Sequence, residues 1–353
     1  MLSMLCSSVF ASEKPTVLMI LSSHISKPKS DILLPLSEKE PFELVNFSTK
    51  GKSDEEIDQA WSSADFVLLD GINPALSKFM FAKYQPKLAQ FSDVKVASLG
   101  DIENLSMNQG LSDENRVRLG EYYNNAGRTN YANMMKFITN DILALEKIED
   151  IPAPVIVPKV GLYHEEYNGD VTDDETAFYK WLNVDENKPV IAIGMHRSIV
   201  DFDQKQVVNA IIEGLEAKGA KAFGFFFEGE DLPMDYTTLL QDEAGNARVD
   251  LMINYRALHY VSKRRNEFEK LGVPVIHALN YTEGDEAAFE ADVAGISPSL
   301  TPFFLVMPED TGSADPTIIA ATTEGVKVVM KDQMNALVER AFNHASLSKV
   351  ANN

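Results

Sequence analysis

The side chains best suited to chemistry are polar residues that directly follow short apolar runs in the second half of the chain. The pattern is clearest in 188–203 (KPVIAIGMHRSIVDFD), where the apolar run 190–193 is soon followed by His196, Arg197 and Ser198. The other members of the set are His164, Glu165, Glu228, Tyr255, Arg256, His277, Asn280 and Glu309. In open α/β sheets the ligand crevice lies beyond the carboxyl ends of the strands. If the runs are neighbouring strands, these side chains converge on one crevice.

Imidazole and guanidinium groups define the chemistry of this set. Imidazole suits iron, cobalt or zinc, as an axial ligand or a direct chelator, which makes His196 and His277 the candidate metal ligands. A guanidinium matches a carboxylate geometrically, so Arg197 and Arg256 suit an acidic ligand. The further candidate ligand-binding residues are His164, Ser198, Tyr255, Asn280 and Glu309. A single histidine at a strand end is more often an ordinary hydrogen-bonded residue, but three of the six histidines share this position.

The elements that position these residues alternate between strand and helix. Apolar runs predict strands, and apolar residues at helical spacing predict the helices between them. The expected strands cover 16–21, 64–69, 94–99, 160–163, 190–193, 221–227, 249–253, 273–276 and 303–306. The expected helices cover 54–61, 73–88, 129–145, 173–182, 207–215, 259–271 and 332–345, with a polar break at 120–128. Such alternation predicts an α/β fold with mostly parallel sheets, built as two Rossmann-like or flavodoxin-like domains.

Length and proline content place the domain boundary. A chain of 353 residues is long for one core, and the stretch 149–159 (EDIPAPVIVPK) holds three prolines. We therefore expect an N-terminal α/β domain over 15–150 and a C-terminal domain over 151–353.

The first residues resemble an export signal. Residues 1–14 are apolar and uncharged up to Ala11, and 9–11 (VFA) is similar to a small-residue cleavage site. They are expected to be a signal peptide, truncated at its start, or a disordered N-terminus, and the protein is expected in the periplasm. Cys6 is the only cysteine, so the mature chain can form neither a disulfide nor a thiolate zinc site.

Charge and missing motifs exclude several classes of partner. The formal charge of −21 argues against nucleic acid and anionic membrane surfaces. No internal apolar run has the length of a membrane span. The chain has neither a Gly-x-Gly-x-x-Gly fingerprint nor a phosphate loop, so neither an NAD nor an ATP site is expected.

Several ordered motifs resemble one enzyme family. These are 160–164 (VGLYH), 191–198 (IAIGMHRS), 271–277 (LGVPVIH), 295–312 (GISPSLTPFFLVMPEDTG) and, more loosely, 123–133 (YNNAGRTNYAN). They resemble the N-terminal region of the large subunit of cobaltochelatase (CobN) and magnesium chelatase. That subunit continues far beyond this region into its main tetrapyrrole-enclosing core, so ATP-driven metal insertion by this chain alone is not expected.

The resemblance implies a ligand and partners. The expected ligand is a tetrapyrrole (haem or a corrinoid) or its divalent metal, delivered by the protein or chelated or dechelated with its help. The expected partners are other chelatase-like or uptake components, and whether the chain is itself an enzyme stays open. Two alternatives remain: a periplasmic receptor for a sugar or amino acid, and a non-catalytic interaction subunit that keeps the fold without the site.

Overall fold

The chain folds into two compact units, 1–156 and 157–353. The computed structural model describes residues 14–21, 26–49, 51–70, 74–99, 107–227, 237–256, 261–323 and 326–352. The expected signal segment, apart from Lys14, and the candidate residue Glu228 lie outside these ranges. Within them, no helix is both long enough and apolar enough to cross a membrane.

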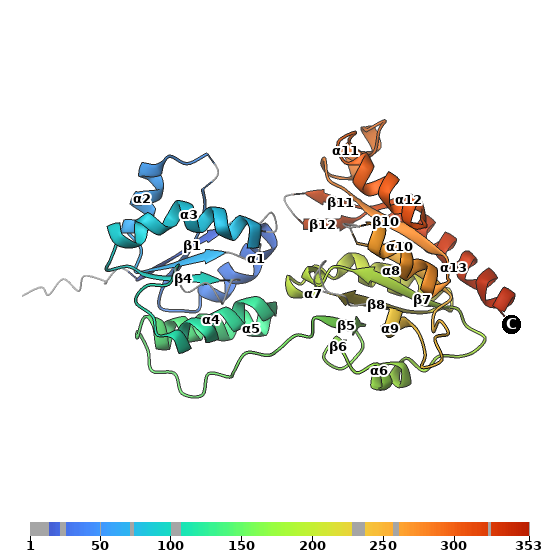
Figure 1. The fold of residues 1–353 in the computed structure, drawn as a ribbon, viewed down its shortest axis with the longest axis horizontal. Helices are drawn as coiled ribbons and strands as arrows, with labels where there is room; N and C mark the ends of the chain where they lie inside the picture. The colour runs from blue at the N-terminus through green and yellow to red at the C-terminus, as the bar shows by residue number, and fades with distance from the viewer. Residues whose placement is uncertain are drawn as a thin grey trace, which may run out of the picture. The chain divides into compact units, whose positions relative to one another are not determined.

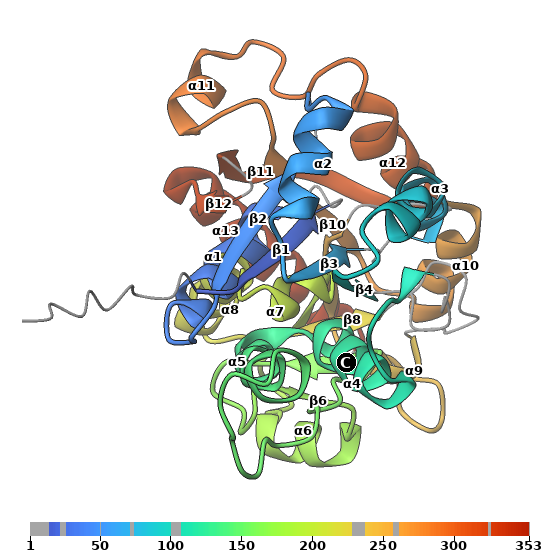
Figure 2. The same cartoon turned by 90° about the vertical axis from the view of Figure 1, so that its left-hand side faces the viewer.

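The first unit is built on a four-stranded parallel sheet in the order β2-β1-β3-β4. Its strands are β1 (Thr16–Leu21), β2 (Glu43–Ser48), β3 (Phe66–Asp70) and β4 (Lys95–Leu99). Its helices are α1 (Ser26–Ser37), α2 (Asp54–Ser62), α3 (Pro74–Gln90), α4 (Asp113–Asn125) and α5 (Gly127–Phe137), followed by the π-helical turn η2 (Ile138–Ile142). Helices α4 and α5 lie side by side (Figure 2).

Local sequence explains the start of α2. The Ser53 side chain accepts a hydrogen bond from the Glu56 backbone, and the Glu56 carboxylate accepts one from the Ser53 backbone. This capping box satisfies two backbone donors that a helix start leaves unpaired. It fixes the helix so that Ile57 and Trp61 are fully buried under the sheet's apolar residues.

A buried ion pair lies at the carboxyl end of β3. The Lys29 ammonium donates to Asp70 Oδ2 at 2.7 Å and to the Tyr123 hydroxyl at 3.0 Å, and both charged side chains are fully buried. Burial lowers the pKa of Lys29 despite the attraction of Asp70. The pair ties α1 to β3 and α4 in the interior of the unit.

The second unit contains an eight-stranded sheet in the order β12-β11-β10-β9-β7-β8-β5-β6 (Figure 1). The strands are β5 (Val160–Tyr163), β6 (Val171–Thr172), β7 (Val190–Met195), β8 (Lys221–Phe227), β9 (Leu251–Tyr255), β10 (Val275–Tyr281), β11 (Ser313–Thr323) and β12 (Val326–Val329). Strands β8, β7, β9, β10 and β11 run parallel. Strand β5 is antiparallel to β8, β6 to β5, and β12 to β11.

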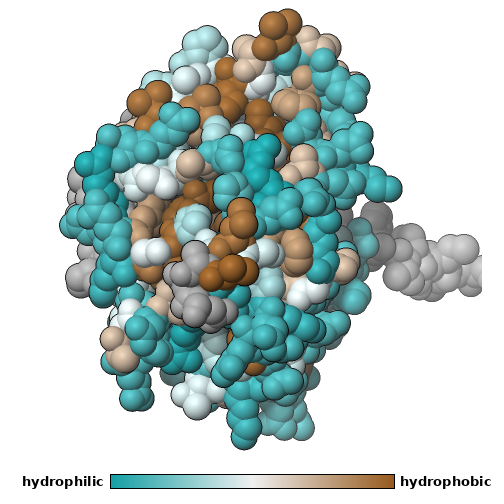
Figure 3. Space-filling model, turned by 90° about the vertical axis from the view of Figure 1, so that its right-hand side faces the viewer, coloured by the Kyte–Doolittle hydropathy of each residue, from teal (hydrophilic) through white to brown (hydrophobic). Residues whose placement is uncertain are grey.

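Helices cover both faces of this sheet. One face packs against α8 (Gln206–Ala217) and α13 (Lys331–Asn352), and the other against α6 (Glu175–Leu182), α9 (Thr237–Leu240) and α10 (Val261–Leu271). The remaining elements are α7 (Ser198–Asp201), α11 (Glu286–Ala291), the π-helical turn η3 (Pro302–Val306) and α12 (Met307–Thr311). Figure 3 shows apolar side chains among hydrophilic ones on one face of the molecule.

The α/β class with mostly parallel sheets is confirmed, while several predicted elements are wrong. The expected strand over 303–306 is the helical turn η3, because Pro302 stands at its first position and favours a helix start. The expected polar break at 120–128 is largely α4, which buries Tyr122 and Tyr123. The sequence patterns did not indicate α1, β2, β11 or β12, and β10 continues past His277 to Tyr281.

Close packing of α8 on α13 yields a first prediction. A Cβ added at Gly214 would lie 2.8 Å from Val338 Cγ2. Gly214→Ala should therefore destabilise the protein by about 1–2 kcal/mol, since overpacking outweighs the gain in helix propensity. In a Val338→Ala background the same change should stabilise the protein. Urea unfolding of the four proteins checks this, and an equal loss in both backgrounds would contradict the packing explanation.

The buried ion pair of the first unit yields a second prediction. Lys29→Met leaves the Asp70 carboxylate buried without its cation and should cost roughly 3–5 kcal/mol. Lys27→Met is the matched control, because Lys27 pairs with Asp31 on the surface at 2.6 Å, where such pairs contribute at most about 1 kcal/mol. Similar losses for both variants, measured by chemical denaturation, would show that burial does not set the cost.

Candidate functional site

The strand order of the second unit brings the ends of β7 and β9 together. The chain passes from β7 to β8 on one side and then returns to β9 on the other. The switch point between β7 and β9 is where ligands bind in open α/β sheets. Gly194 pairs with Asn254 and Met195 with Tyr255. Residues 196–198 and Arg256 therefore leave the sheet beside one another.

The segment after β7 is held by local contacts. His196 is partly buried, and its carbonyl accepts a hydrogen bond from the Ile199 N–H at 3.0 Å. Ser198 begins the short helix α7. The Arg197 Nε donates to Asp201 Oδ1 at 3.2 Å, one helical turn later, and the Arg197 side chain is almost fully buried. Of the three candidates, His196 and Ser198 are therefore more exposed than Arg197.

Arg256 joins the ends of two strands. Its Nη1 donates to the Phe227 carbonyl at 2.6 Å, and its guanidinium carbon lies 4.0 Å from the centre of the Phe227 ring. Phe227 ends β8 and Arg256 follows β9, and these strands flank β7. The guanidinium therefore reaches across the end of β7, held by a hydrogen bond and a cation–π contact.

His277 and Asn254 form a buried polar pair on adjacent strands. Asn254 Nδ2 and the Asn254 carbonyl lie 2.9 Å and 3.2 Å from His277 Nδ1. Burial lowers the pKa of His277 to about 4, opposed by hydrogen bonding to the backbone of Asn254 and Phe304. His277 Nε2 is buried and meets full hydrogen-bond geometry with no described residue. This imidazole is therefore neutral at physiological pH.

Tyr255 and Asn280 form a second polar group. The Tyr255 hydroxyl donates to Asn280 Oδ1 at 2.5 Å, and the Lys327 ammonium lies 5.3 Å from the centre of the Tyr255 ring. Tyr255 belongs to the apolar cluster under α8 and α13, whereas Met252 and Val275 belong to the cluster on the other face. Because side chains alternate along a strand, this group and the Asn254–His277 pair lie on opposite faces of the sheet.

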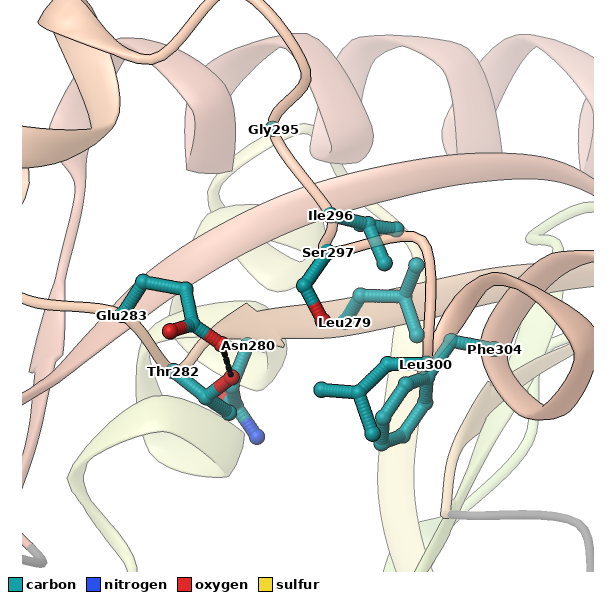
Figure 4. A pocket seen from close by; sticks show the side chains of 9 residues that line it. All are labelled: Leu279, Asn280, Thr282, Glu283, Gly295, Ile296, Ser297, Leu300 and Phe304. Atoms are coloured by element: carbon teal, nitrogen blue, oxygen red, sulfur yellow. Dashed lines mark hydrogen bonds between the residues drawn. The ribbon is translucent and has the colours of Figure 1, made fainter.

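A small pocket, with a cavity volume of about 10 Å³, opens at the end of β10. It is lined by Leu279, Asn280, Thr282, Glu283, Gly295, Ile296, Ser297, Leu300 and Phe304. Polar Asn280, Thr282 and Glu283 stand on one side, facing apolar Leu300 and Phe304 (Figure 4). Two further apolar side chains of η3, Phe303 and Val306, are exposed.

Three candidate residues do not lie where the sequence placed them. His164 and Glu165 follow β5, which is antiparallel to β8, so neither leaves the sheet at the shared carboxyl edge. His164 is enclosed by other contacts. Its ring is buried 4.9 Å from that of Trp181, its Nδ1 accepts from the Glu166 N–H, and its Nε2 lies 3.5 Å from Glu216 Oε1. Glu309 is exposed on α12, because the strand expected before it is helical.

The structure also adds residues that the sequence patterns did not single out. Asn254 holds His277, and the sequence indicated it only as a polar residue directly after an apolar run. Lys327 could not be recognised from the sequence, because the sequence pattern did not predict strand β12. Among the described residues, no group of three or more histidine, cysteine or carboxylate side chains is arranged to hold a metal ion.

Comparisons with known proteins place this doubly wound α/β chain in a family. A family model described as CobN/Magnesium Chelatase matches residues 120–353. The chain belongs to this family, which confirms the resemblance seen in its motifs. The catalytic subunit of cobaltochelatase from Mycobacterium tuberculosis shares the fold, with a TM-score of 0.64 at 15% identity over 95% of this chain and 27% of that chain.

Two magnesium-chelatase relatives show how small a part of such proteins this chain represents. The chloroplastic magnesium-chelatase protein ChlH of Oryza sativa subsp. indica is 26% identical over 243 residues, 62% of this chain and 17% of that protein. The corresponding magnesium-chelatase protein of Rhodobacter capsulatus is 25% identical over 178 residues, 48% of this chain and 14% of that protein. The chain therefore spans less than a fifth of either relative.

The lowered pKa of His277 yields a third prediction. The unfolded chain takes up this proton near pH 6.5 and the folded protein only near pH 4. His277 therefore destabilises the fold as pH falls through that window, by up to about 3 kcal/mol. His277→Asn should remove that part of the pH dependence, whereas exposed His344→Ala should not. Urea unfolding from pH 7.5 to 4 checks this, and parallel profiles for wild type and His277→Asn would contradict it.

Proposed function

We propose that the carboxyl edge of the second unit's sheet binds a tetrapyrrole, haem or a corrinoid, and handles it or its metal. The observation that carries the proposal is that polar residues at the switch point of a chelatase-family fold are linked to a pocket with apolar walls. His196 and Arg256 leave the sheet at the switch point. Asn280 of β10, hydrogen-bonded to Tyr255 of β9, lines the pocket together with Leu300 and Phe304. A macrocycle needs apolar contact for its faces and cations or donors for its acidic rim.

The donor set fits axial ligation better than a closed metal site. Axial ligation requires one accessible imidazole, and His196 is the partly exposed candidate. A divalent ion held by protein alone usually takes three or more side chains, which the described residues do not bring together. We therefore assign His196 the ligand role and His277 the role of a neutral support beneath the site.

The family relationship and the N-terminal sequence support the rest of the proposal. The relatives belong to magnesium chelatase and cobaltochelatase, so metal chelation or dechelation with partner subunits is the proposed setting. The signal-like residues 1–14 support a periplasmic location. Separate assay of periplasmic and cytoplasmic fractions tests the location.

A second candidate function, a receptor for a small polar molecule, is favoured by the polar side chains that line the pocket. Thr282, Glu283 and Ser297 would supply hydrogen bonds to such a ligand. The two functions differ in whether the exposed side chains of Phe303 and Val306 take part.

Absorbance titration with haem and with cobalamin tests the first function. We expect a Soret or corrin band shift in the wild type and its loss, or at least a tenfold weaker affinity, in His196→Ala. His344→Ala is the matched control, since His344 lies on α13 and is half exposed. No shift with either tetrapyrrole would contradict the proposal. Calorimetric binding of amino acids or sugars would then support the receptor function.

A further inference from the structure

Lys327 is a partly buried cation that pairs with no described carboxylate. It lies on β12, opposite Thr322 of β11, at the edge where the parallel strands end. Burial lowers the pKa of its ammonium group to about 8, and no carboxylate in the described part of the chain opposes that shift. In a chain with a net charge of −21, carboxylates are abundant, so a desolvated lysine without one nearby is unexpected.

Two contacts position Lys327, one at its backbone and one at its ammonium group. The Gln206 side chain donates a hydrogen bond to the Lys327 carbonyl at 2.8 Å. Strand β12 is three positions from β9 in the sheet, yet the Lys327 ammonium lies 5.3 Å from the centre of the Tyr255 ring. The Lys327 and Tyr255 side chains therefore extend toward each other and meet over β11 and β10.

Asn280 connects this cation to the pocket. Its Oδ1 accepts from the Tyr255 hydroxyl, which directs its Nδ2 as a donor for another group. Asn280 also lines the pocket beyond β10. One ammonium and one amide donor thus belong to a single connected group of side chains, Lys327, Tyr255 and Asn280.

We propose that Lys327 is the binding residue for a carboxylate of the ligand, with Asn280 Nδ2 as the second donor. An ammonium and an amide N–H are complementary to the two oxygens of a carboxylate. Bringing a negative charge to Lys327 also removes the cost of an unpaired, partly buried cation. The identity of the larger ligand, an acidic tetrapyrrole, rests on the proposed function, whereas the carboxylate site does not.

The first experiment titrates the amine directly in the full chain. Lysines are ¹³C-methylated, and the Lys327 resonance is assigned by its absence in Lys327→Arg. Coproporphyrin, a tetracarboxylate, and citrate, a small tricarboxylate, are added separately. We expect at least one of them to shift the Lys327 resonance and raise the pKa of the amine. If neither does so, the inference is overturned.

The second experiment compares affinities. Lys327→Met should bind the active carboxylate roughly 10- to 100-fold more weakly, the loss of one charge-assisted hydrogen bond. It should bind the uncharged tetra-amide of coproporphyrin as the wild type does. Lys331→Met, which removes an exposed lysine on α13, is the matched control.

Urea unfolding of Lys327→Met tests whether the lysine has a structural role instead. Because methionine keeps the apolar stem and removes an unpaired charge, Lys327→Met should be at least as stable as wild type in urea. A destabilised variant would point to a structural role and overturn the inference.

The outcomes separate this inference from the proposed function. Binding of citrate alone, lost in Lys327→Met, supports the carboxylate site and contradicts tetrapyrrole handling. Equal binding of coproporphyrin by wild type and Lys327→Met supports tetrapyrrole handling and overturns the role of Lys327.

Discussion

The direction of the strands in the second sheet is the constraint on which the site depends. Five parallel strands end at one edge, and the return of the chain from β8 to β9 places a switch point beside β7. The polar residues that follow these strands therefore leave the sheet at the same edge. The antiparallel β5 excludes His164 from the edge, although its local sequence resembles that of the other strand ends. Chain direction, rather than residue type, thus decides which polar groups belong to the site.

The buried polar groups at this edge serve two different purposes. On one face Asn254 holds His277, and Arg256 is held by Phe227, so these contacts stiffen the ends of the strands. On the other face Tyr255 and Asn280 lie beside a lysine that lacks an ionic partner among the described residues. The first group supports the edge, while the second offers charge and donors to a ligand.

Much of this arrangement was predictable, and what was missed has physical causes. Buried parallel strands such as β7 and β8 are continuous apolar runs, and amphipathic α8 follows with the expected spacing. Strands β11 and β12 were missed because Asp315-Pro316 interrupts the apolar pattern of β11, and β12 is short. Without β12, the sequence could not bring Lys327 to the site. The orientation of β5 depends on tertiary pairing, which no local pattern reports.

Hydrogen–deuterium exchange of the full chain with and without haem tests the central claim most directly. If a tetrapyrrole binds at the carboxyl edge, amides of 196–201, 277–283 and 295–306 should exchange more slowly with haem present. Amides near His164 and on the amino side of the same sheet should not change. Protection confined to the first unit, or to the surroundings of His164, would contradict the account.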